Sequence, residues 1–317
     1  MTRPPSAPAP AAAAARRSVL AALAAALAGA LSAACVPPAG APSAATPDAP
    51  PAAAPAAGEV VFFDDFAGSS LDRAKWTVEV WGHTVNDENQ AYIDSPETIA
   101  IVHGDSAAGA VGGALELRPR WRPGFPATDS TTLDFVSGRV NTRGKFTFAH
   151  GTAAARMKLP YGAGLWPAFW ILGTGDWPQT GEIDVMEYVG DSTWTSVALH
   201  GDRYYGDTPL VHRQRFPAGA DAGDWHVYSV DWSADAIVFR VDGGEVYRVT
   251  RPMVERYGTW AFDDAKYLIL NLALGGVYPA SVNGVREPYL GLPASTVEAI
   301  RRNEVRVLVD WVRVTKR

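Results

Sequence analysis

Residues 181–188 read Gly-Glu-Ile-Asp-Val-Met-Glu-Tyr, and this stretch is the most informative in the chain. Its apolar residues are typical of a β-strand, in which side chains alternate between the two faces. Glu182 and Asp184 therefore share a face, whereas Glu187 would lie on the opposite face of a regular strand. A β-bulge absorbs one residue and restores the alternation. We predict a bulge near Val185 and Met186 that returns Glu187 to the acidic face.

Two glutamates on one strand face suit the hydrolysis of a glycosidic bond. With one residue bulged out, four strand steps of ~3.3 Å place the two Glu backbones ~13 Å apart. Long side chains that lean together can close most of this gap. A retaining glycosidase holds its carboxyl groups ~5–5.5 Å apart, so that one attacks the anomeric carbon and the other protonates the leaving oxygen. Asp184 lies between them and can keep their protonation states distinct.

Two other interpretations of residues 182–187 stay open on the motif alone. A half-exposed strand with an acidic face needs no function, and short motifs of this kind have many false positives. Clustered carboxylates also bind hard cations. The flanking sequence has to decide among the three.

The charge of the chain limits its partners. The 317 residues carry a formal net charge of −6. The chain has 28 basic and 34 acidic residues, of which only three basic residues and one acidic residue lie in residues 1–57. Residues 58–317 therefore carry a net charge of −8. Such a surface repels nucleic acid and anionic membranes, whereas a neutral polymer is indifferent to it. Residues 58–317 are long enough for one large all-β domain.

Residues 1–35 have the features of an export signal. An apolar run at 19–31 is too short to span a membrane, and Arg-Arg-Ser-Val-Leu at 16–20 is similar to a twin-arginine signal. Small residues before Cys35, the only cysteine, resemble a bacterial lipobox, although Ser32 stands where Leu is usual. An ordinary cleaved signal is the alternative to a lipid anchor at Cys35.

Residues 36–57 are rich in Pro and Ala. They cannot bury a core, so we expect a disordered or extended tether. The front of the chain thus predicts an exported protein, either extracellular or held at the cell surface or in the periplasm as a lipoprotein.

From residue 60 onward, short apolar or alternating runs are separated by Gly, Pro, Asp and Asn. No long helical periodicity and no internal repeat interrupts them. Many short strands with frequent turns argue for a β-sandwich. A turn at 242–244 predicts a hairpin, and Ser295 with Glu298 has the form of a capping box that opens a short helix. Strands are predicted at residues 60–63, 114–117, 153–159, 227–232, 237–241, 267–274 and 305–314.

The motifs around the acidic stretch occur in a recognisable order. They are Asn-Asp-Glu-Asn-Gln-Ala-Tyr at 86–92, Ser-Gly-Arg at 137–139, Gly-Lys-Phe at 144–146, Gly-Leu-Trp-Pro-Ala-Phe-Trp-Ile-Leu-Gly at 164–173, Trp-Pro at 177–178, His-Gly at 200–201, Phe-Arg-Val-Asp-Gly at 239–243, Leu-Ile-Leu-Asn-Leu-Ala at 268–273 and Val-Asp-Trp-Val-Arg-Val at 309–314. In this order they resemble glycoside hydrolase family 16, and within it the bacterial endo-β-1,3-glucanases (laminarinases). The resemblance covers about residues 58–317.

The resemblance implies a jelly roll of two curved antiparallel sheets, with a concave face that carries the substrate cleft. Matched position by position, Glu182 would be the nucleophile, Glu187 the general acid/base, and Asp184 the residue that orients Glu182. The implied activity is that of a monomeric retaining endo-β-1,3-glucanase acting on laminarin-type polymers. Hydrolysis of mixed-linkage β-glucan or of a galactan on the same fold is the alternative, as is a non-catalytic glycan-binding jelly roll.

The resemblance also implies substrate-binding residues. An aromatic ring offers a flat apolar surface to a sugar, although ordinary core claims most Trp residues in β-proteins. At the positions of Asn86, Arg139 and His200, relatives use polar side chains to hydrogen-bond glucan hydroxyls or to brace the catalytic Glu. Glu88 and Gln90, expected on the same strand face as Asn86, are weaker candidates. The candidates are Asn86, Arg139, Trp166, Trp170, Trp177 and His200.

Relatives of this kind often hold a structural calcium on the convex face, and Asp65 and Asp310 match its acidic ligands loosely. Calcium needs six or more oxygens, and sequence does not show which carbonyls would help. We expect no metal or other cofactor in the chemistry. One departure from the family concerns 275–279, where Gly-Gly is followed by Val277 and Tyr278 in place of the usual Trp.

Overall fold

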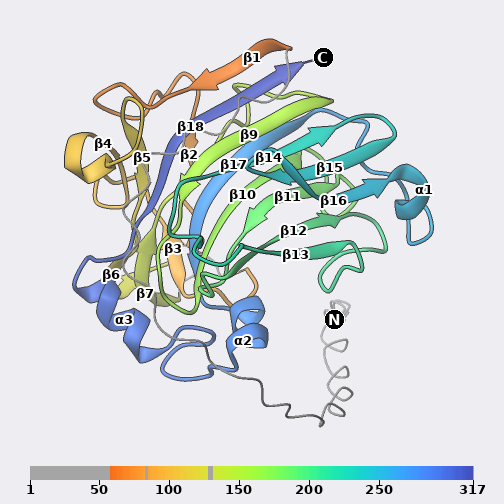
Figure 1. The fold of residues 1–317 in the computed structure, drawn as a ribbon. Coiled ribbons are helices and arrows are strands. Elements are labelled where there is room, and N and C mark those ends of the chain that lie inside the picture. Colours follow the sequence, from red (N-terminus) through yellow and green to blue (C-terminus); the bar gives the residue numbers. More distant parts are fainter. Residues whose placement is uncertain (1–57, 83–84, 128–130, 317) are drawn as a thin grey trace, which may run out of the picture. The chain divides into compact units, whose positions relative to one another are not determined.

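The computed structural model describes residues 58–316, apart from 83–84 and 128–130. The predictions for residues 1–57, which include the export signal, the lipid site at Cys35 and the tether, fall outside the described residues. The described part is built mainly of strands in two large sheets and one small sheet (Figure 1). The predicted all-β sandwich is therefore confirmed.

One large sheet contains the N-terminal and C-terminal strands of the described part, β1 and β18. Its strand order is β16-β15-β14-β9-β18-β5-β4, and β1 also pairs with β18. All its pairings are antiparallel. The bounds are β1 Glu59–Asp64, β4 Ile99–Val102, β5 Ala114–Leu117, β9 Gly151–Lys158, β14 His226–Trp232, β15 Ala236–Val241, β16 Gly244–Thr250 and β18 Val307–Lys316.

The second large sheet carries the acidic stretch. Its order is β13-β12-β11-β10-β17-β8-β2, so β11 lies near the middle of the sheet. The bounds are β2 Thr77–Val78, β8 Arg139–Asn141, β10 Leu165–Gly173, β11 Glu182–Glu187, β12 Trp194–His200, β13 Val211–Arg215 and β17 Lys266–Leu274.

Strand β10 shows why this sheet has a core face and a cleft face. Leu165, Phe169 and Ile171 are fully buried in the hydrophobic core between the large sheets. Trp166 and Trp170 alternate with them and are only partly buried. Each fully buried apolar side chain contributes about 1.5–3 kcal/mol relative to exposure. Burial of the first set therefore fixes the strand orientation and turns the indoles to the other face.

A small sheet and short helices complete the described part. Parallel β3 and β7 pair in the small sheet, and β6 joins the other edge of β7. No helix among the described residues is long and apolar enough to cross a lipid bilayer. The bounds are β3 Gln90–Tyr92, β6 Arg120–Pro126, β7 Thr132–Ser137, a 3₁₀ turn Gly104–Ala107, α1 Arg251–Val254, α2 Val277–Asn283 and α3 Ala294–Arg301.

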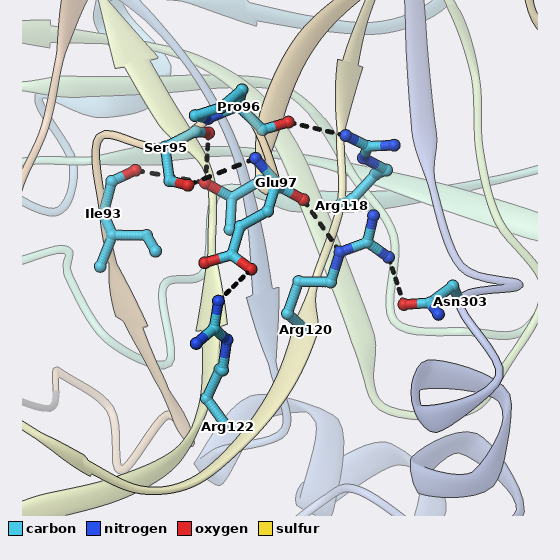
Figure 2. Close-up of polar contacts among 9 residues, drawn as sticks. Ile93, Ser95, Pro96, Glu97, Arg118, Arg120, Arg122 and Asn303 are labelled. Atoms are coloured by element: carbon cyan, nitrogen blue, oxygen red, sulfur yellow. Dashed lines mark hydrogen bonds and ion pairs between the residues drawn. The ribbon is translucent and has the colours of Figure 1, made fainter.

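Three arginines at alternate positions on and just before β6 form hydrogen bonds and an ion pair with neighbouring segments, as Figure 2 shows. Arg118 donates to the carbonyl of Pro96 at 2.7 Å, and Arg122 pairs with the carboxylate of Glu97 at 2.5 Å. Arg120 donates to the carbonyl of Glu97 at 3.0 Å and to the side chain of Asn303, just beyond α3, at 2.5 Å. The segment that includes α3 is thus fastened beside the small sheet.

The strand predictions agree with the structure to within two residues at each end. The hairpin between β15 and β16 is confirmed, with Asp242 and Gly243 at φ of 50° and 81°. The short helix predicted near Ser295 is confirmed, but its capping box is wrong. Helix α3 begins at Ala294 after Pro293, and Ser295 lies within its first turn. Glu298 pairs with Arg301 instead of reaching back to the helix start.

Candidate active site

The β-bulge predicted in β11 is confirmed against both neighbouring strands. On β10, Trp170 pairs with Asp184 and Phe169 with Met186, so Val185 has no partner there. On β12, the register also shifts between Asp184 and Glu187. Val185 and Met186 are both buried, with 1% and 0% of their surface exposed. Two consecutive residues thus face the core, and Glu187 returns to the face of Glu182.

A cleft with a volume of about 400 Å³ lies over this face. Glu182, Asp184 and Glu187, which we call the acidic trio, all line it. Five of the six predicted binding residues also line it, namely Asn86, Arg139, Trp166, Trp170 and Trp177. A site of this volume is typical of small-ligand pockets and holds only part of a polysaccharide chain.

Each member of the acidic trio has its own nitrogen partner. The indole Nε1 of Trp177 donates to Glu182 Oε2 at 3.0 Å. The indole Nε1 of Trp166 donates to Glu187 Oε1 at 3.0 Å. The sixth predicted residue, His200, places Nε2 3.2 Å from Asp184 Oδ2. The two indoles therefore orient the glutamates, a role that a sugar-stacking prediction does not include.

The pKa values in the trio are strongly raised. The pKa of Glu182, Asp184 and Glu187 is raised in each case to about 8, and burial is the largest cause for all three. The negative charge of Asp184 raises the pKa of both glutamates further, while His200 and the indole donors oppose this effect. Groups so close titrate as a unit. The trio therefore retains protons near neutral pH.

Arg139 is buried in the cleft floor. Only 8% of its surface is exposed, and its Nε lies 3.2 Å from Glu79 Oε2. Its guanidinium carbon lies 5.0 Å from the ring centroid of Trp81 and 4.9 Å from that of Trp170. An ion pair combined with stacking on aromatic faces is a favourable environment for arginine. Arg139 is thus a brace for the aromatic floor as well as part of the cleft lining.

Two polar residues of the cleft floor were missed from the sequence. Trp170 Nε1 donates to Asn271 Oδ1 at 2.7 Å, and Asn271 Nδ2 donates to the hydroxyl of Tyr92 at 3.1 Å. Both Asn271 and Tyr92 line the cleft. A signal existed for Asn271, because it is the one polar residue between Tyr267 and Leu274, a run that is otherwise apolar.

Asn86 lies in a turn, so the prediction that it shares a strand face with Glu88 and Gln90 is wrong. Its φ is 56° and that of Asp87 is 54°, and the strand begins only at Gln90. The three predicted residues nevertheless all line the cleft. Gln90 Nε2 donates to Glu88 Oε2 at 2.8 Å, and burial raises the pKa of Glu88.

Residues 86–287 match the protein family described as glycosyl hydrolases family 16, over more than half of the chain. The chain belongs to glycosyl hydrolase family 16. The prediction made from the ordered motifs is thereby confirmed at the level of the family.

Relatives of this family 16 chain include both sequences and solved structures. It is 32% identical over 283 residues to glucan endo-1,3-beta-glucosidase A1 of Niallia circulans, and the match covers 81% of this chain and 38% of that protein. It is 32% identical over 235 residues to a beta-glucanase of Rhodothermus marinus, covering 69% of this chain and 77% of the relative. The chain spans well under half of the Niallia protein and about three quarters of the Rhodothermus one.

The fold of the family 16 domain is similar to that of the laminarinase catalytic domain from Thermotoga maritima MSB8. The TM-score is 0.67 at 28% identity, and the match covers 82% of this chain and 98% of that one. The jelly-roll sandwich predicted from the sequence is confirmed.

The two acids predicted as calcium ligands have different hydrogen-bond partners in this family 16 domain. Asp310 is 1% exposed, and its Oδ1 and Oδ2 accept hydrogen bonds from the Val111 amide at 2.8 Å and from Arg156 Nη1 at 2.6 Å. Asp65 Oδ1 instead accepts from the amide of Ala67 at 3.3 Å. The guanidinium of Arg156 thus neutralises Asp310, whereas Asp65 is exposed, and the structural calcium stays a prediction.

Tyr278, two positions after the Gly-Gly at 275–276, packs against Trp166. Its hydroxyl is 3.1 Å from Ser196 Oγ, and its ring meets the indole of Trp166 edge-to-face at 5.3 Å. Burial, followed by the charge of Glu187, raises the pKa of Tyr278 to about 12. The neutral phenol therefore packs against the indole that donates to Glu187.

Proposed function

We propose that the chain is a retaining endo-β-1,3-glucanase that cleaves laminarin-type polymers by double displacement. The observation that carries this proposal is the bulge at Val185, which brings Glu182, Asp184 and Glu187 to one cleft with indole donors on both glutamates. Relatives described as glucan endo-1,3-beta-glucosidase and beta-glucanase support the choice of polymer.

In the first step of the proposed reaction, the Glu182 carboxylate attacks the anomeric carbon as the glycosidic bond breaks. Glu187 gives its proton to the departing oxygen, so that a glycosyl ester on Glu182 and a free sugar hydroxyl result. In the second step Glu187, now ionised, takes a proton from water. The water oxygen attacks the same carbon, and Glu182 leaves as a carboxylate with the original anomeric configuration restored.

The electrostatics of the site keep a proton among the acidic trio without distinguishing the two glutamates. Glu187 has to be protonated before the first step, and its burial together with the charge of Asp184 favours that form. Burial and the charge of Asp184 raise the pKa of Glu182 in the same way, and His200 and an indole donor lower the pKa of both glutamates. The division of roles therefore rests on the match to the family motif and not on these shifts. The two glutamates supply both the nucleophile and the proton, so we propose that the reaction needs no metal or other cofactor.

A panel of polysaccharides tests the proposed substrate. New reducing ends are expected from laminarin, and the first product observed by NMR is expected to have the β configuration. Products from agarose or carrageenan alone would overturn the choice of β-1,3-glucan. Binding to laminarin without any product would favour a glycan-binding jelly roll. Products from lichenan at the same rate as from laminarin would extend the substrate to mixed-linkage β-glucan.

Replacing Asp184 with Asn is expected to shift the pH profile of kcat/KM toward lower pH by about one unit. After burial, the charge of Asp184 is the next cause that raises the pKa of both glutamates. Its removal lets Glu187 lose its proton at a lower pH, which shifts the alkaline limb, and lets Glu182 ionise earlier, which shifts the acid limb. The exposed Asp176→Asn variant is the control, and an unmoved alkaline limb in Asp184→Asn would contradict this electrostatic role.

For the remainder of the chain, we propose that residues 1–35 direct export and that the domain acts as a monomer outside the cytoplasm. Lipid attachment at Cys35 is tested by a Cys35→Ser variant expressed in a bacterial host. Loss of membrane association together with release of active protein is the expected result.

A further inference from the structure

Two large aromatic rings stand exposed beside each other at the Glu182 end of the cleft. Trp177 is 49% exposed and Tyr205 is 52% exposed. Their ring centroids lie 5.4 Å apart, and the ring planes make an angle of 71°. Trp177 lines the cleft, whereas Tyr205 lies beyond the residues that line it. The two rings form a corner, which we call the aromatic corner, with apolar faces open to solvent.

The loop that carries Tyr205 is firmly fixed at both ends. Tyr204 is 1% exposed and donates its hydroxyl to the carbonyl of Thr259 at 2.9 Å. Gly201 and Tyr204 exchange two backbone hydrogen bonds of 3.0 and 3.1 Å. On the other side, the buried Thr208 donates to the carbonyl of Leu199 at 2.9 Å. Exposed Tyr205 is therefore presented between two buried anchors.

Trp177 is fixed in a similar way. Its Nε1 donates to Glu182, and its loop is closed by a hydrogen bond of 2.8 Å from the Thr180 amide to the Asp176 carbonyl. The Gly175 amide also donates to Thr180 Oγ1 at 3.0 Å. Rings that are held in place before binding lose little conformational entropy when a ligand stacks on them. The exposed faces of the aromatic corner are thus pre-organised for contact.

The charges around the aromatic corner indicate a neutral ligand. Asp176 precedes Trp177, and Asp202 and Asp207 lie on the Tyr205 loop. Arg203 is the basic residue there, and its Nε lies 3.9 Å from Asp202 Oδ2. Such an acidic margin repels sulfated or carboxylated polymers. A pyranose, by contrast, offers an uncharged face of C–H groups that matches an aromatic ring.

We propose that the aromatic corner is a distal sugar-binding subsite, and that it holds a neutral β-glucan chain where the chain leaves the cleft beyond Glu182. Two rings at 71° contact successive sugars that are not coplanar. Chains with β-1,3 linkages turn from sugar to sugar, whereas β-1,4-linked chains form flat ribbons. The corner therefore suits the turning chain. This inference rests on the proposed function and names the part of the polymer that the cleft alone cannot hold.

The test is the affinity for laminarihexaose and for laminaritriose, measured by calorimetry in the Glu187→Gln background so that neither ligand is cut. Adding Tyr205→Ala is expected to raise the Kd for the hexaose about tenfold, as expected when part of an aromatic face loses apolar contact. The Kd for the triose, which the cleft holds, is expected to change less than twofold. Tyr205→Phe is expected to preserve hexaose affinity, because the ring and not the hydroxyl makes the contact.

Tyr161→Ala is the matched control. Tyr161 is 62% exposed, and its hydroxyl donates to Asp221 at 3.0 Å, outside the cleft lining. Its loss is expected to leave both affinities unchanged. An unchanged hexaose Kd in the Tyr205→Ala variant, or equal losses for triose and hexaose, would overturn the distal subsite. If the unmodified protein cuts no laminarin while the Tyr205 effect on hexaose binding remains, the proposed hydrolysis fails and the subsite stands.

Discussion

Replacing Glu182 with Gln is expected to reduce laminarin hydrolysis by on the order of 10⁴-fold or more while the fold stays intact. The amide keeps an oxygen that accepts the hydrogen bond from Trp177 Nε1, and its volume is nearly that of the carboxylic acid. It cannot form the glycosyl ester that the double displacement requires. The initial rate of reducing-end release measures the loss, and circular dichroism with a thermal melt tests the fold.

The identity of the nucleophile is tested separately with Glu182→Ala and added azide. Removing the side chain leaves space on the face from which Glu182 would attack. Azide that enters there can displace the leaving group once, and the expected product is a glycosyl azide of inverted, α configuration. A β product would place the missing residue on the opposite side of the sugar. Activity of Glu182→Gln close to that of the unmodified protein would refute the assignment itself.

The bulge could be predicted because strand geometry leaves few choices. A regular strand would turn Glu187 toward the core, where an isolated buried carboxylate costs several kcal/mol or stays neutral. One extra residue removes this conflict, and Val185 and Met186 are the apolar residues available to enter the core. The acidic trio thus followed from alternation and from the cost of burying charge.

The contacts between side chains could not be predicted in the same way. Alternation places Trp166 on the cleft face, but it does not determine that Nε1 reaches Glu187 instead of leaving the ring flat beneath a sugar. That outcome depends on Tyr278, which packs against the indole from more than one hundred residues further along the chain. The capping box at Ser295 failed for a related reason, because Pro293 precedes the helix and neighbouring Thr296 donates to the carbonyl of Ala163 at 2.9 Å. Tertiary contacts thus override a local signal.

Tyr205 shows another limit of the sequence. A tyrosine between Tyr204 and Gly206 in a polar loop carries no pattern that separates a sugar platform from an ordinary exposed ring. Its relation to Trp177 emerges only when β12 pairs with β11 and brings His200 opposite Glu182, because the Tyr205 loop follows His200 directly. Strand register, and not composition, places the two rings together.

Replacing Glu187 with Gln is expected to lower kcat/KM for laminarin by about 10²–10⁴-fold, the usual contribution of a general acid–base group. A sugar hydroxyl is a poor leaving group and needs the proton from Glu187. In a dinitrophenyl β-glucoside oligomer the leaving group is dinitrophenolate, which departs without a proton, so the first step with this substrate is expected to be much less affected. The glycosyl ester then accumulates because no base activates water. A burst of dinitrophenol followed by slow turnover, with a lowered KM, is the expected time course.

The matched control for this variant is Glu88→Gln. Glu88 also lines the cleft, and burial also raises its pKa, but its hydrogen-bond partners are Gln90 and Asn86 and it does not contact the acidic trio in any described hydrogen bond. Its replacement is expected to retain the alkaline limb of the pH profile, whereas Glu187→Gln is expected to abolish that limb. Azide is expected to restore turnover of the dinitrophenyl substrate in Glu187→Gln with a β-glycosyl azide as product, because it attacks the ester from the face that Glu187 serves. Equal losses for laminarin and the activated substrate would show that Glu187 acts on binding or folding and not on proton transfer.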